Sequence, residues 1–375
     1  MIYFLFNSYE PGTAVTNRAL AYAHALSVLH QGSTFIFIHP NKQKSRFTRD
    51  MPHINFVYWW NSLSAKHNIL RCGWAKIKLQ LFIRSLKAGD SVYLYNNSEL
   101  IDFFVDIKDV SVFHERTEHP EVHTFLSTRF NQITLQGYYE SCKKIVGLFV
   151  ISTALRDLFV KNGVDKSKVD IINVIVDSSR FEGLKKQDTE KYICYCGTAS
   201  NNKDGVDELI KSFAIFHKKH NDVKLYIVGN TPSKNDEAQN LQLIESLGIS
   251  NYVVFTGIVP PEEMPQLLKN ATMLALDRPD SLQARNGFPT KLGEYLLSAN
   301  PVVVTKVGDI PLFLRDGYNA LLAEERNPQE FAEKMCWIIE HPEEARIVGL
   351  NGSEIARIHF NNIIETQKII NRINK

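Results

Sequence analysis

RNGFPTKLGEYLLSANP, residues Arg285–Pro301, is the segment that decides the fold. Proline is favoured in the first turn of a helix and threonine at its N-cap, so Pro289 and Thr290 predict that a helix begins there. Apolar side chains then recur at i, i+3, i+4 and i+7, which places one stripe of the helix against a core. These side chains are Leu292, Tyr295, Leu296 and Ala299. The following PVVVT predicts a strand from Pro301.

Two charged residues lie three positions apart near the start of this predicted helix. The first turn of a helix carries unpaired N–H groups and the positive end of the helix dipole, which together attract a phosphate. Lys291 adds a point charge for that phosphate, and Glu294 can accept hydrogen bonds from the vicinal hydroxyls of a ribose. An ordinary Lys–Glu pair on a surface helix explains the same spacing, so this segment alone leaves both interpretations open.

The composition is that of a globular protein of about two domains. The chain has 375 residues, of which 44% are apolar and 22% charged. Its net charge of +2 gives no general attraction to nucleic acid. The five cysteines are scattered, which favours buried thiols in a reducing compartment over disulfides or zinc: Cys72, Cys142, Cys194, Cys196 and Cys336. IYFLF at the start is too short for a signal peptide, and no apolar run reaches the length of a membrane span, so we expect a cytoplasmic protein.

Strands and helices are predicted to alternate along both halves of the chain. A strand at 2–6, a turn at Pro11-Gly12, a helix from Thr16 and a strand at 34–39 form a crossover unit. Because Gly12 stands alone, G-x-G-x-x-G is missing, which argues against an NAD enzyme. Further strands are expected at 91–95, 110–113, 144–151, 169–174, 192–196, 224–228, 252–255 and 271–276. We therefore predict an α/β protein with two doubly wound parallel sheets, joined by a polar linker within Asp177–Lys191.

Residues 41–87 differ from the rest of the chain in charge. They contain three of the four tryptophans and a single acidic residue, Asp50. Their cations are Lys42, Lys44, Arg46, Arg49, Lys66, Arg71, Lys76, Lys78, Arg84 and Lys87. Basic side chains interleaved with tryptophan indicate an anionic membrane surface as a partner. A solvated basic face with inward tryptophans explains the pattern slightly better, whereas nucleic acid is a weaker choice because no binding motif accompanies the charge.

A run of titratable residues, His114–Pro120, follows the strand predicted at 110–113. Open α/β sheets bind ligands at the carboxyl ends of their strands, so HERTEHP predicts a sugar or acceptor site. A charged loop with local ion pairs is the alternative. The segment is not an H-E-x-x-H zinc motif, because His114 and His119 lie five residues apart and a proline follows.

Several motifs occur together in the order of one known family. They are Gly197 with Lys203-Asp204-Gly205, Ile227-Val228-Gly229, Phe255-Thr256-Gly257, NGFPTKLGEYL, and PVVVT leading to Gly308-Asp309-Ile310-Pro311. The Pro11-Gly12 turn, Ser152, and the segment from Asn173 to Asp177 fit the same pattern. The chain resembles a family 4 retaining glycosyltransferase of the GT-B fold (glycosyltransferases group 1). The resemblance covers nearly the whole chain and is strongest in residues 192–322.

This resemblance implies an N-terminal Rossmann-like acceptor domain (1–180), a nucleotide-sugar domain (181–350) facing it across a cleft, and a C-terminal helix (351–375) crossing back. It implies retaining hexosyl transfer from a UDP- or GDP-linked sugar to a hydroxyl acceptor, in surface polysaccharide or lipid-linked glycan synthesis. No D-x-D pair is present, so we expect no metal and no other cofactor. The alternatives are a nucleotide-sugar binding protein without transferase activity and a GT-B sugar-nucleotide epimerase.

The resemblance also assigns residues to the site. The donor-binding residues are Gly12, Gly197, Thr198, Lys203, Asn286, Gly287, Phe288, Pro289, Thr290, Lys291 and Glu294, with Lys203 on the diphosphate and Glu294 on the ribose. The catalytic set is His114, Glu115, Lys203 and Lys291, in which His114 or Glu115 orients sugar or acceptor hydroxyls.

Two positions depart from the family pattern. Thr198 stands where family members carry an arginine after the glycine, so Lys291 is expected to supply the missing charge. Family members usually carry two glutamates eight residues apart. Asn286 occupies the position of the first, and Glu294 matches the second. Asn286 can hydrogen-bond a sugar hydroxyl, but it lacks the charge of a carboxylate. We therefore expect the positioning of the sugar, rather than the binding of the nucleotide, to differ from that of the family.

Overall fold

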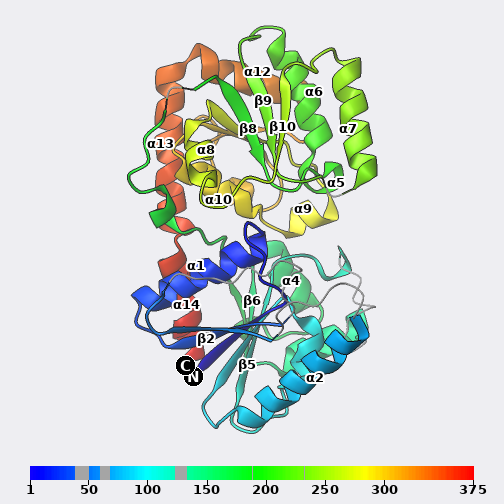
Figure 1. Cartoon of the computed structure of the whole chain (residues 1–375), viewed down its shortest axis with the longest axis vertical. Coiled ribbons are helices and arrows are strands. Elements are labelled where there is room, and N and C mark those ends of the chain that lie inside the picture. The colour runs from blue at the N-terminus through cyan, green and yellow to red at the C-terminus, as the bar shows by residue number, and fades with distance from the viewer. Residues whose placement is uncertain (39–49, 60–67, 123–132, 188, 232) are drawn as a thin grey trace. The chain divides into compact units, whose positions relative to one another are not determined.

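The computed structural model describes residues 1–38, 50–59, 68–122, 133–187, 189–231 and 233–375, with the backbone alone over 68–73. The chain forms two compact units (Figure 1). Unit 1 combines Met1–Asp177 with Asn362–Lys375, and unit 2 is Ser178–Asn361. Each unit is a parallel sheet with helices, so the predicted α/β class with two doubly wound sheets is confirmed.

The sheet of unit 1 has seven parallel strands in the order β3-β2-β1-β4-β5-β6-β7. They are β1 (Ile2–Phe6), β2 (Ser33–Phe37), β3 (Ile54–Tyr58), β4 (Ser91–Tyr95), β5 (Ser111–Arg116), β6 (Gly147–Val150) and β7 (Val169–Ile171). β1 pairs with both β2 and β4, with Ile2 opposite Ser33 and Ser91. The strand order therefore reverses beside β1, which makes the carboxyl ends of β1 and β4 a topological switch point.

Helices and aromatic side chains complete unit 1. The helices are α1 (Ala14–Val28), α2 (Asn68–Ser85), α3 (Leu135–Lys144), α4 (Thr153–Lys161) and α14 (Asn362–Ile373), with short 3-10 helices at Ser98–Phe103, Pro120–Val122 and Lys166–Lys168. Thr13 caps α1 and Ser152 caps α4, each accepting a backbone N–H with its hydroxyl. Phe4 lies at the centre of the core, with ring centroids 4.8 Å from those of Phe35 and Tyr93. β3 and α2 were not predicted.

The C-terminal helix α14 belongs to unit 1. The Asn362 side chain donates to the carbonyl of Ala21 at 3.0 Å, and Glu365 accepts the backbone N–H of Asn173 at 3.0 Å. Ile369, 0% exposed, joins the core of the first sheet. The crossing was expected from residue 351, but α13 (Pro342–His359) remains in unit 2 and only α14 lies in unit 1.

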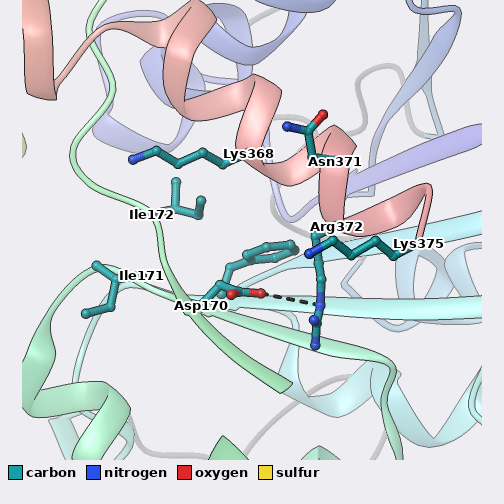
Figure 2. Close-up of a pocket in the computed structure, with 8 residues that line it drawn as sticks. Asp170, Ile171, Ile172, Lys368, Asn371, Arg372 and Lys375 are labelled. Atoms are coloured by element: carbon teal, nitrogen blue, oxygen red, sulfur yellow. Dashed lines mark ion pairs between the residues drawn. The ribbon is translucent and has the colours of Figure 1, made fainter. Parts of the chain in front are cut away.

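A pocket of about 210 Å³ lies between β7 and α14, and none of the predicted site residues lines it. Figure 2 shows Arg372 beside Asp170, with Lys368 on the same helix and Lys375 just beyond its end. The Arg372 Nε lies 3.4 Å from an Asp170 carboxylate oxygen. This ion pair lies within unit 1, between β7 and α14.

The sheet of unit 2 has six parallel strands in the order β10-β9-β8-β11-β12-β13. They are β8 (Tyr192–Cys196), β9 (Lys224–Val228), β10 (Val253–Gly257), β11 (Met273–Leu276), β12 (Val302–Thr305) and β13 (Leu321–Ala323). The helices are α5 (Asn201–Asp204), α6 (Val206–His217), α7 (Lys234–Ser246), α8 (Met264–Asn270), α9 (Leu282–Asn286), α10 (Thr290–Leu297), α11 (Ile310–Phe313), α12 (Pro328–Glu340) and α13, after a 3-10 turn at Ser178–Phe181. Every residue of β8 is buried, as expected of a strand covered on both faces.

The buried state predicted for the cysteines is confirmed where side chains are described. Cys142, Cys194, Cys196 and Cys336 are buried and free. The side chain of Cys72 lies outside the described residues.

Candidate functional site

The candidate site is the loop that follows β8 at the carboxyl edge of the second sheet. Gly197 ends the strand with φ +139°, a backbone conformation that side chains other than glycine rarely adopt. A Cβ at this position would lie 2.4 Å from the Lys291 Nζ and 2.8 Å from its Cε. Glycine is therefore required here both by its conformation and by the passage of the Lys291 side chain.

Lys291, Asp204 and Tyr195 form a buried cluster behind this loop. The Lys291 Nζ lies 2.7 Å from Asp204 Oδ2 and 2.9 Å from the Tyr195 hydroxyl, and 4.3 Å from the centroid of the Tyr195 ring. The side chains of Lys291 and Asp204 are 14% and 5% exposed. The Tyr195 hydroxyl also lies 2.7 Å from the carbonyl of Thr198, so the cluster braces the loop. An ammonium has three donors, and these contacts use two of them.

The charges of this cluster keep Asp204 ionised. Burial alone would raise the pKa of the Asp204 carboxyl, but the positive charges of Lys291 and Arg278 outweigh burial and lower that pKa below its ordinary value. Arg278, which follows β11, was not predicted as a site residue. Its side chain is 3% exposed, and its carbonyl accepts the Thr305 hydroxyl at 2.7 Å. The sequence feature that could have identified Arg278 is its position as a cation at the carboxyl end of β11, a strand that pairs with β8.

Lys203 and Thr198 lie on the same loop. Lys203 is on α5, where its backbone N–H donates to the Ser200 hydroxyl at 3.3 Å, and its side chain is partly exposed. Thr198 is exposed. Gly197, Thr198 and Lys203 therefore share the loop against which Lys291 packs, and their predicted role in binding phosphate stays a prediction.

Glu294 lies one turn after Lys291 on α10 and forms an ion pair with Arg180. Arg180 also donates from Nη2 to the carbonyl of Pro261 at 2.8 Å. The side chains of Arg180 and Glu294 are 26% and 16% exposed, respectively. Arg180 was not predicted as a site residue, because it lies in the polar linker and its partner is distant in sequence. A ribose that binds Glu294 through Oε1 would have to displace this guanidinium.

The start of α10 differs from the sequence prediction in one detail. Pro289 occupies the N-cap without a side-chain hydrogen bond, and Thr290 is the first helical residue, so the assignment of Thr290 as N-cap is wrong. Phe288 is buried against Phe313 and Phe360, at 5.6 and 5.4 Å between ring centroids. Its side chain anchors the segment, and the predicted contact of the Gly287 and Phe288 backbone with a ligand stays a prediction. Asn286 ends α9 and donates to the carbonyl of Leu282 at 2.9 Å.

His114 lies in the interior of unit 1, within β5. The strand extends to Arg116, so the expectation that a loop begins after residue 113 is wrong. His114 is fully buried, and its Nδ1 and Nε2 lie 2.9 Å from the Leu94 carbonyl and from the Tyr138 hydroxyl. Burial lowers the pKa of His114 to about 3, so the ring is neutral near pH 7. These contacts indicate a structural role and argue against the proposed role on substrate.

Glu115 is buried in the same strand and bound by three side chains. Its carboxylate lies 2.6 Å from the Arg18 guanidinium and accepts the hydroxyls of Tyr22 and Tyr93 at 3.0 and 2.6 Å. A carboxylate held in this way stabilises the interior of unit 1, and it is not directed at solvent. Gly12, by contrast, is exposed in the turn before α1 with φ +82°. Its predicted role near the ligands stays a prediction.

Comparisons with known proteins find similarity to glycosyltransferases. Residues 190–341 match the family model described as Glycosyl transferases group 1. An uncharacterized glycosyltransferase of Methanocaldococcus jannaschii is 28% identical over 203 residues, which cover 53% of this chain and 52% of that protein. A D-inositol 3-phosphate glycosyltransferase of Corynebacterium jeikeium is 28% identical over 149 residues, 39% of this chain and 34% of that protein. The alignment with the first of these relatives thus spans about half of its length.

Two solved structures share the fold over the whole chain. Anabaena Alr3699/HepE, in complex with UDP and glucose, superposes with a TM-score of 0.73 at 18% identity and covers 100% of this chain and 99% of its own. Sucrose-phosphate synthase from Thermosynechococcus elongatus gives a TM-score of 0.74 at 13% identity, with 99% and 97% covered. These similarities establish the GT-B fold.

Proposed function

We propose that the chain, which has the GT-B fold and matches the group 1 glycosyltransferase model over residues 190–341, transfers a hexosyl residue from a nucleotide sugar to a hydroxyl acceptor. The observation that carries this proposal is the cationic cluster at the carboxyl edge of the second sheet, where the Lys291 ammonium lies against the bare backbone of Gly197. The acceptor proposed is a surface polysaccharide or a lipid-linked glycan. The assignment to family 4 is part of this proposal.

The donor is proposed to bind with its diphosphate on Lys203 and Lys291. Charged donors and backbone N–H groups at the start of α10 would neutralise the phosphates, so no metal ion is required. Glu294 would accept the ribose hydroxyls, and Asn286 would hydrogen-bond the sugar. UDP and GDP donors both fit this scheme, and the complex of HepE with UDP and glucose supports a nucleotide-sugar donor.

Retention is proposed to occur by front-face transfer. Double displacement would need a carboxylate nucleophile beneath the anomeric carbon, but Asn286 lacks a carboxylate and Glu294 is assigned to the ribose. In the front-face route the bond from the anomeric carbon to the diphosphate breaks, and the bond to the acceptor oxygen forms on the same face. The departing phosphate oxygen takes the acceptor's proton, while Lys203 and Lys291 stabilise the developing charge.

A thermal-shift panel of UDP, GDP and their sugars, followed by product analysis, tests the function. A ligand selective for the folded state raises the melting temperature. We expect one nucleotide sugar to stabilise the protein and an added acceptor to yield a glycoside with retained anomeric configuration, read from its NMR coupling. Donor binding without transfer would favour the binding-protein alternative, and an altered donor sugar would favour an epimerase. A β-linkage from an α-donor would exclude the front-face route.

We also propose peripheral binding to an anionic membrane, carried by α2. Trp74, Ile77 and Leu81 are 43%, 52% and 54% exposed, and their spacing places them on one face of the helix. The cations beside them in the described part are Lys76, Lys78 and Arg84, and the Lys78 ammonium lies 5.1 Å from the Trp74 ring centroid. An apolar stripe bordered by cations is typical of a helix that lies in a bilayer interface.

Much of the rest of the basic segment lies outside the described residues. Lys42, Lys44, Arg46, Arg49, Trp60 and Lys66 lie outside the described residues, as does the side chain of Arg71. Trp59 is 7% exposed, so it packs inward. Among the described residues, no helix combines the length and apolar composition needed to cross a bilayer.

Vesicle sedimentation tests the membrane proposal. Anionic vesicles should bind the protein, salt should weaken that binding, and charge reversal at Lys76, Lys78 and Arg84 should release it. Equal sedimentation with neutral and anionic vesicles would contradict the proposal.

A further inference from the structure

Three side chains that bind metals in other proteins converge at the junction of α6 and α12, away from the proposed donor site. They are His220, three residues beyond the end of α6, and Cys336 and Glu340 on α12. Their ligand atoms all lie within 4.8 Å of one another. Cys336 and Glu340 are four residues apart, so they share one face of their helix.

The histidine ring is held in place, but its Nε2 has no hydrogen bond. The His220 ring lies against Phe216, 5.1 Å between centroids, and its backbone N–H donates to the Phe216 carbonyl at 3.2 Å. In the part of the chain that is described, Nε2 is buried without a hydrogen-bond partner and lies 3.5 Å from Glu340 Oε1. An unsatisfied buried nitrogen costs free energy, so a group that binds it would stabilise the domain.

The three ligands differ in kind, and together they favour zinc. Imidazole nitrogen, thiolate sulfur and carboxylate oxygen are the zinc ligands of proteins, at about 2.0–2.3 Å from the ion. Cys336 is reduced and 6% exposed, whereas the Glu340 side chain is 49% exposed and its Oε1 already lies 3.5 Å from His220 Nε2. Glu340 is also the last residue of α12, where the helix dipole favours a cation. The positive charge of Lys219 is close enough to influence Cys336 and opposes a cation there.

We propose that His220, Cys336 and Glu340 bind one zinc ion, with water in the fourth position, and that this ion ties the end of α6 to α12. The thiol would lose its proton to solvent when the ion binds. α6 starts directly after Gly205 and spans 12 residues, so the site lies about 18 Å along the helix from the donor loop. The zinc would therefore act on the stability of unit 2 and not on glycosyl transfer, and this inference is independent of the proposed function.

Zinc titration of the intact protein, in competition with a chromophoric chelator, tests the site. We expect one ion bound per chain, and a higher melting temperature with zinc. Cys336→Ser, His220→Gln and Glu340→Gln should each weaken binding by roughly tenfold or more, since each removes a ligand. Glu333→Gln, an acidic residue on the same helix but outside the cluster, is the control and should bind zinc as the wild type does.

Cobalt provides a second readout that identifies the sulfur ligand. Co²⁺ in place of zinc should give a thiolate charge-transfer band that Cys336→Ser abolishes and Glu333→Gln retains. Because Glu340 is half exposed, Glu340→Gln should fold normally and keeps the test valid if the cysteine variant is unstable. No saturable zinc binding in the micromolar range, or unchanged binding in Cys336→Ser and Glu340→Gln, would overturn the proposal.

Discussion

Replacing Lys291 with methionine should destabilise unit 2 as well as weaken nucleotide binding. The substitution keeps most of the side-chain volume but removes the charge that lies 2.7 Å from Asp204. Asp204 is 5% exposed, so it would be left as a buried carboxylate with no ammonium beside it. Breaking one partner of such a pair costs about 3–5 kcal/mol. For a unit of this size that corresponds to a fall in Tm of roughly 6–20 °C.

A double-mutant cycle separates the pair from its surroundings. Asp204→Asn alone removes the other charge, and the double variant Lys291→Met with Asp204→Asn removes both. We expect the double variant to be less damaged than the sum of the single ones by about 0.5–3 kcal/mol, measured by urea unfolding. The control is Lys306→Met, which removes an exposed pair with Glu324 and should change stability by at most about 1 kcal/mol.

Acid unfolding is a second, independent test of the Lys291–Asp204 pair. Because the folded-state pKa of Asp204 lies below its ordinary value of 3.8, this group contributes stability above that pH, and the contribution is lost as pH falls through the folded pKa. Lys291→Met should reduce this pH dependence. A Lys291→Met protein as stable as the wild type, with additive single effects, would refute the claim that the pair braces the loop.

The remaining predictions concern nucleotide binding and pH. Lys203→Ala should weaken nucleoside diphosphate binding roughly tenfold or more, because a charge-assisted contact is worth about 1.5–3 kcal/mol; unchanged affinity in calorimetry would remove Lys203 from the site. Arg180→Gln should tighten binding if Arg180 competes with the ribose for Glu294, and weaker binding would instead make Arg180 a ligand contact. Burial raises the pKa of Asp277 to about 7, and the nearby Glu208 and Asp207 act in the same direction although a hydrogen bond from Ser212 opposes them. This carboxyl is protonated in the folded state below that pH, so its contribution to stability falls as pH rises from about 4 through 7. Asp277→Asn should flatten this fall, so the variant should gain stability relative to the wild type on going from pH 5 to pH 8. Equal pH profiles of the free energy of unfolding in wild type and variant would contradict this prediction.

The sequence predicted unit 2 well because its strands are short apolar runs that end at glycine or a charge. YICYC and KLYIV stop at Gly197 and Gly229, and both strands have the expected bounds. A parallel strand that is buried on both faces is a continuous apolar run, so it can be recognised from its own residues alone. The local sequence was therefore sufficient for these strands, whereas the short edge strand β13 was not predicted.

The errors arose where buried polar groups find partners far along the chain. His114 and Glu115 resemble a charged loop in sequence, but Glu115 is bound by Tyr22, which lies 93 residues away. Glu294 is paired with Arg180 at a separation of 114 residues. Local periodicity carries no information about such pairs, so burial could not be distinguished from exposure at these positions.

Because unit 1 combines Met1–Asp177 with Asn362–Lys375, its folding cannot be completed until that later segment has been synthesised. After Asp177 the ribosome still has to add unit 2 and then Asn362–Lys375, which takes about 10–40 s at roughly 5–20 residues per second. Throughout that interval the surface that will receive Ile369 and Ile370 is open, and it is available to chaperones or to other nascent chains. Unit 2, which is continuous, can fold first. A chain that stops short of Asn362 would therefore carry a folded unit 2 and a first unit whose core lacks Ile369 and Ile370.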